Sequence, residues 1–201
     1  MSKIRLVLAS ASPARWATLR RAGIDPIIEV SAVDEEAVAA ELRAHDPQAS
    51  PADVALVLAT AKARDVAVRR ATTAGPEREL VLGCDSILDL DGVPFGKPAG
   101  AAEAMTRWRA MSGRTGILHT GHWIVDRPGP GRPAREIGAT ASTTVHFANL
   151  DEEEITAYVA TGEPLAVAGA FTIDGIGGPF VTGIQGDPHN VVGLSLPLLR
   201  T

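Results

Sequence analysis

The strongest constraint on the fold is a strand, a hydroxyl-containing turn and a helix that follow one another near the start of the chain. Leu6–Ala9 is an apolar run long enough for a buried strand and too short for a helix. Ser12-Pro13 is a helix-start signal, because the hydroxyl can cap the helix and the proline ring suits its first position. Trp16 and Leu19 predict the apolar stripe of this helix, and Gly23 ends it.

The turn between this strand and this helix is a candidate phosphate site. Backbone N–H groups and the positive end of the helix dipole point at such a turn and favour a bound anion. Ser10, Ser12 and Arg15 would surround that position. The same pattern also fits an ordinary capped helix, and the motif alone leaves both interpretations open.

The size and composition predict a globular protein with a full hydrophobic core. The 201 residues suffice for one domain or for two tightly joined lobes. Hydrophobic residues make up 45% and charged residues 21%, which is too apolar for a disordered chain. No apolar run has the length of a membrane span, and no signal peptide is recognisable, so we expect no membrane partner. The single cysteine, Cys84, favours a reducing cytoplasm.

The charge balance bears on the partners. The formal net charge is −5, which argues against a nucleic-acid groove because such a groove needs a basic face. A small polyphosphate ligand stays compatible with this charge, since a few cations gathered in a cleft suffice. Lys3, Lys62 and Lys97 are the only lysines in the sequence, and all other basic residues are arginine. An ammonium is a compact point charge, which makes Lys62 and Lys97 candidates for a phosphate site.

Charged candidates also follow the predicted strands. Asp85 comes directly after Leu80–Cys84, a run typical of a buried central strand, whose carboxyl end often presents functional groups. Asp91-Gly92 predicts a hairpin turn that brings Lys97 back beside Asp85. The residues alone leave a second interpretation open for two of these side chains, Asp85 as a turn former and Lys62 as a solvated flank of its helix.

The rest of the chain predicts further strands and helices. Strands are expected at Pro26–Val30, Ile117–Val125 and Ile137–Phe147, and helices after Glu36, from Ser50, at Ala101–Met111 and after Asp151. A polar linker at Thr72–Glu79 and a Pro- and Gly-rich loop at Arg127–Arg135 separate some of these elements. The glycine-rich region from Gly169 to Gly193 predicts tight turns or a close approach of the backbone to a ligand.

The histidines and the cysteine show no pattern of a metal site or a nucleophile. His119 and His122 lie an odd number of residues apart on a predicted strand and therefore point to opposite faces. Cys84 is interpreted as a small buried hydrophobe, since no histidine partner is evident. The remaining candidates are the carboxylates Glu35 and Asp85 with nearby cations and hydroxyls. This set suits Mg²⁺ or Mn²⁺ together with a polyphosphate.

Short motifs follow one another in a fixed order along nearly the whole chain. They are Ser10-Ala-Ser-Pro-Ala-Arg15, Ser31-Ala-Val-Asp-Glu35, Ala61-Lys62-Ala63, Gly83-Cys-Asp85-Ser86, Gly96-Lys97-Pro98, Ser112-Gly-Arg114-Thr115, Gly162-Glu-Pro-Leu165, Ala168-Gly-Ala-Phe171 and Asn190-Val-Val-Gly193. Each motif is weak alone, but their joint order and spacing resemble the Maf family of nucleotide pyrophosphatases, which is historically linked to septum formation.

The resemblance implies an α/β fold with an elongated, curved mixed β-sheet flanked by helices, as in inosine triphosphate pyrophosphatases. It implies one Maf-like domain over residues 1–201, with two lobes and a central cleft. It also implies a hydrolase that acts on acid anhydrides. Such an enzyme cleaves the α–β phosphoanhydride bond of a nucleoside triphosphate and releases a monophosphate and pyrophosphate.

The resemblance also implies roles for particular residues. Asp85 matches the family's proposed general base, and Glu35 and Asp85 match its positions for a divalent metal cation, Mg²⁺ or Mn²⁺. The matching substrate-handling positions are Ser10, Ser12, Arg15, Lys62, Ser86, Lys97 and Asp174.

Three positions linked to base selection depart from the common family pattern. Ala14 stands where arginine is frequent, Ser86 where threonine is frequent, and Asp174 where glutamine or glutamate is frequent. Strong discrimination requires polar groups that the wrong substrate leaves unpaired, and these residues offer fewer such groups. We therefore expect a broad or non-standard nucleotide specificity, typical of a house-cleaning enzyme.

A second function stays open, that of a non-catalytic nucleotide-binding regulator of cell division. Carboxylates facing a polyanion add little to binding without a metal, which favours the enzyme. A Rossmann-type cofactor module is disfavoured because its glycine fingerprint does not follow the first predicted strand. We expect nucleoside triphosphates as ligands and a cytoplasmic location, with a homodimer as a candidate assembly.

Overall fold

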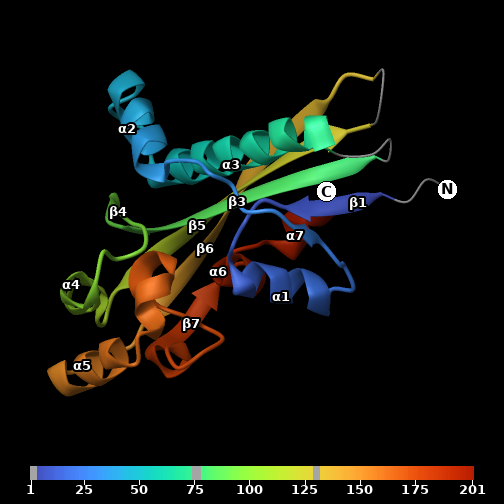
Figure 1. Cartoon of the computed structure of the whole chain (residues 1–201). Helices are drawn as coiled ribbons and strands as arrows, with labels where there is room; N and C mark the ends of the chain where they lie inside the picture. The colour runs from blue at the N-terminus through green and yellow to red at the C-terminus, as the bar shows by residue number, and fades with distance from the viewer. Residues whose placement is uncertain (1–3, 74–77, 129–131) are drawn as a thin grey trace.

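A mixed sheet of seven strands forms the centre of the protein in the computed structural model, which describes residues 4–73, 78–128 and 132–201 (Figure 1). Its strands are β1 (Arg5–Leu8), β2 (Ile27–Ile28), β3 (Glu79–Leu90), β4 (Val93–Phe95), β5 (Thr115–Arg127), β6 (Arg135–Phe147) and β7 (Val181–Gln185). They follow the order β2-β1-β3-β5-β6-β7, and β4 pairs with β3 outside this path. β1 runs parallel to β2 and β3, whereas the other pairs are antiparallel.

Helices flank the sheet. They are α1 (Pro13–Arg21), α2 (Glu35–His45), α3 (Pro51–Thr73), α4 (Ala101–Met111), α5 (Glu152–Ala160), α6 (Pro188–Val192) and α7 (Leu196–Arg200), with short 3-10 turns at η1 (Glu163–Ala166), η2 (Ala168–Ala170) and η3 (Gly178–Phe180). Figure 1 shows α3 along one face of the sheet, α1, α6 and α7 on the other, and α4 and α5 together at one end. The expected α/β class with a mixed sheet flanked by helices is confirmed.

Strand β3 is buried on both faces, as its apolar run Leu80–Cys84 predicts. On one face, Val81 packs with Ala63 and Val66 of α3. On the opposite face, Leu82 packs with Leu19 of α1. The alternation of strand side chains therefore joins β3 to both helical layers.

Gly83 lets α3 approach β3 unusually closely. A Cβ atom at Gly83 would lie 2.1 Å from the Ala59 carbonyl oxygen and 2.7 Å from the Ala63 backbone nitrogen. No larger residue fits there without moving backbone. This close approach brings Lys62, on the same turn of α3, next to Asp85.

One edge of β3 has no neighbouring strand over its middle. β1 pairs with β3 as far as Leu82, and β4 pairs with β3 from Leu88 onward. Between these points no strand in the described ranges covers that edge. Asp85 and Ser86 lie in this gap and point to opposite faces of the strand. Side chains from both faces can therefore reach one opening.

A second apolar core surrounds Trp108 of α4, at the end of the molecule that carries α5. The Trp108 ring is fully buried and makes edge-on contacts with Phe147, Tyr158 and Phe180. Its indole N–H donates a hydrogen bond to the Ala170 carbonyl at 2.7 Å. Such contacts satisfy the polar atom of a buried tryptophan while its ring fills the core.

The starts of α1 and α5 agree with the sequence prediction, whereas the buried face of α1 differs from it. Ser12 caps α1, and Asp151 forms a capping box at the start of α5. The prediction that Trp16 lies on the buried stripe of α1 is wrong, because Trp16 is 43% exposed. Helix α1 instead buries the face that carries Thr18 and Leu19.

Part of the predicted linker at Thr72–Glu79 and part of the loop at Arg127–Arg135 lie outside the described residues. The arrangement as a single domain with two lobes stays a prediction. Within the described ranges, no helix combines the length and the apolar character that crossing a membrane requires.

Candidate active site

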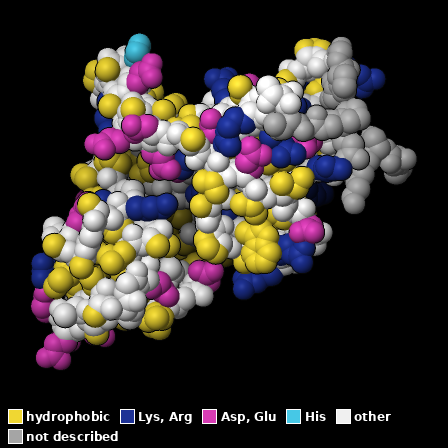
Figure 2. Space-filling model, in the orientation of Figure 1, with side chains coloured by type: hydrophobic (Ala, Val, Ile, Leu, Met, Phe, Trp, Pro, Cys, Tyr) yellow, Lys and Arg dark blue, Asp and Glu magenta, His cyan; other side chains and the backbone are white. Residues whose placement is uncertain are grey.

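A cleft of about 550 Å³ opens beside the uncovered edge of β3. Figure 2 shows the surface hollowed between the part that carries α4 and α5 and the part that carries α1. The cleft is lined by every site residue predicted from the sequence, which are Ser10, Ser12, Arg15, Glu35, Lys62, Asp85, Ser86, Lys97 and Asp174. Its volume is that of a site for a small-molecule ligand.

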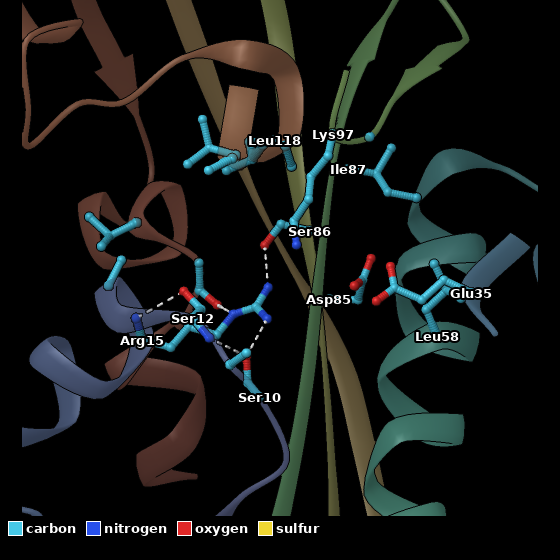
Figure 3. Close-up of a pocket in the computed structure, with 18 of the residues that line it drawn as sticks. Ser10, Ser12, Arg15, Glu35, Leu58, Asp85, Ser86, Ile87, Lys97 and Leu118 are labelled. Carbon is cyan, nitrogen blue, oxygen red and sulfur yellow. Dashed lines mark hydrogen bonds between the residues drawn. The ribbon is translucent and has the colours of Figure 1, made fainter. Parts of the chain in front are cut away.

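Lys62 joins two carboxylates in this cleft. Its Nζ atom lies 2.5 Å from Asp85 Oδ1 and 2.7 Å from Glu35 Oε1. Lys62 and Asp85 are only 7% and 8% exposed, whereas the Glu35 side chain is half exposed. Figure 3 shows the Asp85 and Glu35 carboxylates turned toward each other between β3 and α3. The interpretation of Lys62 as a solvated helix flank is therefore wrong, because α3 docks with this position facing β3.

The environment of Asp85 changes its acidity. Burial raises the pKa of Asp85, and the positive charges of Lys62 and Arg15 offset this only in part, so the pKa stays above its ordinary value. A carboxylate with a raised pKa is a stronger base than an exposed one. Asp85 can therefore accept a proton from a group bound in the cleft.

Arg15 is held in place by the protein itself. Its Nε donates to the Gly193 carbonyl at 2.7 Å, and one terminal nitrogen donates to the Cys84 carbonyl at 2.8 Å and to Ser10 Oγ at 3.1 Å. The other terminal nitrogen donates to Ser86 Oγ at 3.1 Å (Figure 3). The guanidinium thus ties the turn after β1 to β3 and to the C-terminal segment, and it contributes a fixed positive charge to the cleft wall.

The two serines before α1 organise the same turn. Ser12 Oγ accepts from the Arg15 backbone N–H at 3.4 Å and so caps the helix. Ser10 Oγ accepts from the Ser12 N–H at 3.2 Å. Both serines line the cleft at the start of α1, where the helix dipole favours a negative group.

Lys97 and Asp174 also line the cleft, and both are exposed. Lys97 follows β4, as the predicted hairpin requires, and no carboxylate in the described part of the chain forms an ion pair with it. An exposed ammonium on a four-carbon stem can follow a bound phosphate. Lys97 therefore differs from Lys62, whose charge is already shared by two carboxylates.

Cys84 and His122 are buried near the cleft but are not arranged as a nucleophile or a metal ligand. Burial raises the pKa of the Cys84 thiol to about 11. His122 Nε2 accepts from the Ser195 N–H at 2.9 Å, and its Nδ1 lies 2.9 Å from the Thr120 carbonyl. Burial lowers the pKa of His122 to about 4, so the ring is neutral and both nitrogens are occupied. The prediction that Cys84 is a buried hydrophobe is confirmed.

The donor set in the cleft fits a hard divalent cation only together with a ligand. Glu35 and Asp85 present carboxylate oxygens to the same point, now bridged by Lys62. In the described ranges, no group of three or more Asp, Glu, His or Cys side chains could enclose a metal. Mg²⁺ is commonly held by one or two carboxylates together with substrate phosphates and water. The residues present therefore fit such an ion.

Sequence reasoning missed several lining residues. Arg43 of α2 and the segment Thr172–Ile173 face the cleft. Arg43 gave no signal, because it is one of many arginines and lies on an exposed helix. The glycine-rich region predicted a close approach of the backbone to a ligand. In the structure, the Gly193 carbonyl of this region accepts a hydrogen bond from the Arg15 side chain.

Known proteins resemble this chain over nearly its whole length. A family model described as Maf-like protein matches residues 5–201. The nucleoside triphosphate pyrophosphatase of Salinispora tropica is 57% identical over 197 residues, which cover 98% of this chain and 81% of that protein. The nucleoside triphosphate pyrophosphatase of Streptomyces coelicolor is 55% identical over 198 residues, which cover 98% of this chain and 87% of that protein. That of Leifsonia xyli is 51% identical over 197 residues, which cover 98% of this chain and 90% of that protein. The matched residues include every residue that lines the cleft.

Proposed function

Because this chain belongs to the family of Maf-like proteins, we propose that it hydrolyses nucleoside triphosphates to nucleoside monophosphate and pyrophosphate. The relatives named nucleoside triphosphate pyrophosphatase support this activity. The observation that carries the proposal is the ion cluster in which buried Lys62 and Asp85 meet the half-exposed Glu35 in a ligand-sized cleft. A cluster of this kind combines a base with charges that are arranged before the substrate binds.

The reaction is an in-line attack of water on the α-phosphorus. Asp85 accepts a proton from the attacking water as the new oxygen–phosphorus bond forms. The bond from the α-phosphorus to the bridging oxygen breaks, and that oxygen leaves with pyrophosphate. Burial of Asp85, which raises its pKa, makes this carboxylate a better proton acceptor at the moment of attack.

Cations of this chain stabilise the charge that develops on the phosphates. Lys97 lies on an exposed connection and can contact the phosphates directly, whereas Arg15 presents a fixed charge beside the N-terminus of α1. Lys62 keeps the Asp85 carboxylate oriented through its 2.5 Å contact. Removing one donor from such a preorganised site typically costs about 10²–10³ in rate.

Glu35 and Asp85 are the residues that would hold Mg²⁺ or Mn²⁺. When bound, such an ion neutralises phosphate charge and lowers the pKa of coordinated water. Lys62 contacts both of these carboxylates, and the third N–H of its ammonium can donate to a phosphate oxygen.

The proposed specificity is broad. Ala14 lines the cleft without a polar group. Ser86 Oγ is occupied by Arg15 at 3.1 Å and by Thr120 Oγ1 at 2.9 Å, which leaves it little capacity for a base. Asp174 accepts hydrogen bonds but cannot donate one when ionised. Few groups in the wall can therefore reject a wrong base.

The experiment is an assay of pyrophosphate release from dTTP, UTP, CTP, GTP and 7-methyl-GTP, with Mg²⁺, with Mn²⁺ and with a chelator. We expect release with either metal, none with the chelator, and no nucleotide preferred by more than about 10³ in kcat/KM. Release from none of these nucleotides would refute the proposed activity.

The remaining expectations depend on this activity. Nucleoside triphosphates are the proposed ligands, and a cytoplasmic location, a homodimer and the absence of nucleic-acid binding stay proposals. Neither the geometry of the cleft nor the names of the relatives adds support for the alternative, a non-catalytic regulator of cell division.

A further inference from the structure

The carboxylate of Glu163 does not line the cleft, yet it holds one of its walls. Glu163 is the first residue of η1, and two residues separate it from the end of α5. Its Oε1 accepts hydrogen bonds from the Thr172 hydroxyl at 2.5 Å and from the Gly177 N–H at 2.9 Å. Its Oε2 accepts from the Ile176 N–H at 2.9 Å. The segment 172–177 therefore wraps around a single carboxylate.

The segment has no spare room around this group. A Cβ atom at Gly175 would lie 2.4 Å from Glu163 Oε2, and a Cβ atom at Gly177 would lie 2.4 Å from the Tyr158 hydroxyl oxygen. The Tyr158 hydroxyl itself donates to Glu163 Oε1 at 3.0 Å. Glycine at these two positions lets the backbone close onto the carboxylate, and Tyr158 supports the carboxylate from behind.

These hydrogen bonds favour the ionised form of Glu163. Burial acts to raise the pKa of Glu163, but hydrogen bonds from Thr172, Ile176, Gly177 and Tyr158 outweigh it, and the pKa lies below its ordinary value. Hydrogen bonds to an ionised acceptor are stronger than those between neutral groups. The anchor is therefore charged at neutral pH.

The anchored segment forms part of the cleft wall. Thr172, Ile173 and Asp174 line the cleft. The Glu163 carboxylate accepts hydrogen bonds from Thr172 and from Ile176, which lie on either side of Ile173 and Asp174 in the sequence. These hydrogen bonds fix both ends of the short stretch that carries Ile173 and Asp174.

The chemistry of this wall suits the nucleoside and not the phosphates. Asp174 would repel a triphosphate, but it can accept hydrogen bonds from the N–H groups of a base or the hydroxyls of a sugar. Ile173 adds an apolar surface. Lys62, Arg15 and Lys97, which suit the phosphates, come from other parts of the cleft.

We propose that Glu163 is a positioning residue for nucleotide selection, which holds Ile173 and Asp174 where they contact the nucleoside. This inference rests on the proposed function, since it names a residue that shapes the substrate site. Glu163 itself touches no reacting atom and acts through the segment it anchors.

The first test is the kinetics of Glu163→Gln on the same nucleotide panel. The side-chain amide of glutamine would place N–H donors opposite the N–H and O–H donors of segment 172–177. Hydrogen bonds to the segment are therefore lost, while the side-chain volume is kept. We expect KM to rise about 10-fold for the best substrate, as for the loss of a hydrogen bond to a charged group. The Asp85–Lys62 pair is untouched, so kcat should change by less than about 3-fold, the pattern expected when ground-state and transition-state binding are lost equally. The ratio of kcat/KM between nucleotides should change as well.

The second test is hydrogen exchange of the backbone amides. In Glu163→Gln the amides of Ile176 and Gly177 should exchange faster than in the wild type, while amides around Trp108 should not change. Glu154→Gln is the matched control, because Glu154 belongs to the capping box of α5 and glutamine also serves there. This control should keep KM, kcat and the exchange of Ile176 unchanged. Glu163→Asp, which keeps the charge but shortens the side chain, should give a smaller shift in the same direction.

A folded Glu163→Gln variant with unchanged KM and unchanged nucleotide ratios would overturn the inference, as would a loss confined to kcat. Pyrophosphate release from no nucleotide by the wild type is a separate outcome that refutes the proposed function. The exchange experiment uses no substrate and would still report whether Glu163 anchors the segment.

Discussion

The Nζ atom of Lys62 lies 2.5 Å from Oδ1 of Asp85 within the cleft. The same ammonium lies 2.7 Å from Glu35 Oε1, so one positive charge holds two carboxylates together. Lys62 comes from α3 and Asp85 from β3, and the contact depends on the close approach of these elements at Gly83. The charges that face a substrate are therefore in place before it binds, which is how preorganised sites stabilise developing charge.

Replacing Lys62 by methionine should move the acid limb of the pH profile of kcat/KM to higher pH. The charge of Lys62 opposes the burial that raises the pKa of Asp85, so removing this charge raises the pKa of Asp85 further. The variant should also lose at least about 10² in kcat/KM. Arg64→Met is the control, because Arg64 is an exposed cation on the same helix that pairs with Glu136. An acid limb at its wild-type position in Lys62→Met would contradict the role given to this contact.

Asp85→Asn should abolish most of the activity without abolishing nucleotide binding. The amide keeps the shape but removes the base, and losing a positioned base costs about 10²–10⁴ in rate. Titration calorimetry with a non-hydrolysable triphosphate analogue in the presence of a chelator should show binding at least as tight as in the wild type, because one negative charge has gone. Asp89→Asn is the control on the same strand, since Asp89 accepts from the Gly92 N–H and lies 3.8 Å from His119 Nε2 but does not line the cleft. Near-full activity of Asp85→Asn would remove Asp85 from the mechanism.

Local signals predicted much of the fold. The capping hydroxyl of Ser12 and the capping box at Asp151 mark helix starts, and Asp91-Gly92 marks a hairpin between β3 and β4. Each of these signals depends on residues within a few positions of one another. The strand expected at Leu80–Cys84 continues through Asp85 to Leu90, so Asp85 lies within a strand and not after its end, because β5 pairs with β3 from Glu79 to Asp89.

The burial of the site could not be predicted in the same way, because it depends on contacts between distant parts of the chain. Lys62 is buried because Gly83 admits α3, and Arg15 is held by the Gly193 carbonyl, 178 residues away. The exposure of Trp16 has the same origin, since the face of α1 that packs is decided by its partners. All of the site residues that the family resemblance implied line the cleft, but the hydrogen bonds that hold Arg15 appear only in the fold.

The two tryptophans on short helices should differ strongly in their contribution to stability. Trp108→Ala should lower the free energy of unfolding by about 3–5 kcal/mol, because the ring is fully buried and its loss leaves a cavity. Trp16→Ala should lower it by less than about 1 kcal/mol, because this ring is 43% exposed and its contact is with Arg20 at the surface. Urea unfolding of the two variants measures both values. Equal losses of unfolding free energy in the two variants would contradict the burial of Trp108 and the exposure of Trp16.

Acidification should destabilise the protein through His122. Burial lowers the pKa of this ring to about 4, whereas in an unfolded chain it is about 6.5. Between these values the unfolded state binds the extra proton, so stability is full above about pH 6.5 and falls as the pH drops toward 4. Urea unfolding measures how much the free energy of unfolding falls between pH 7 and pH 5. This fall should be about 2 kcal/mol smaller in His122→Gln than in the wild type. His119, whose pKa burial also lowers, is present in both proteins and cancels in the comparison. Equal losses in the two proteins would rule out His122 as the source.

The most direct measurement is phosphorus NMR of the products formed in ¹⁸O-labelled water from a nucleoside triphosphate. Attack at the α-phosphorus, beside Asp85 and Lys62, predicts nucleoside monophosphate that carries the label and pyrophosphate that does not. No nucleoside diphosphate should appear at any stage. Labelled pyrophosphate with unlabelled monophosphate, or orthophosphate together with nucleoside diphosphate, would contradict cleavage by water at the α-phosphorus.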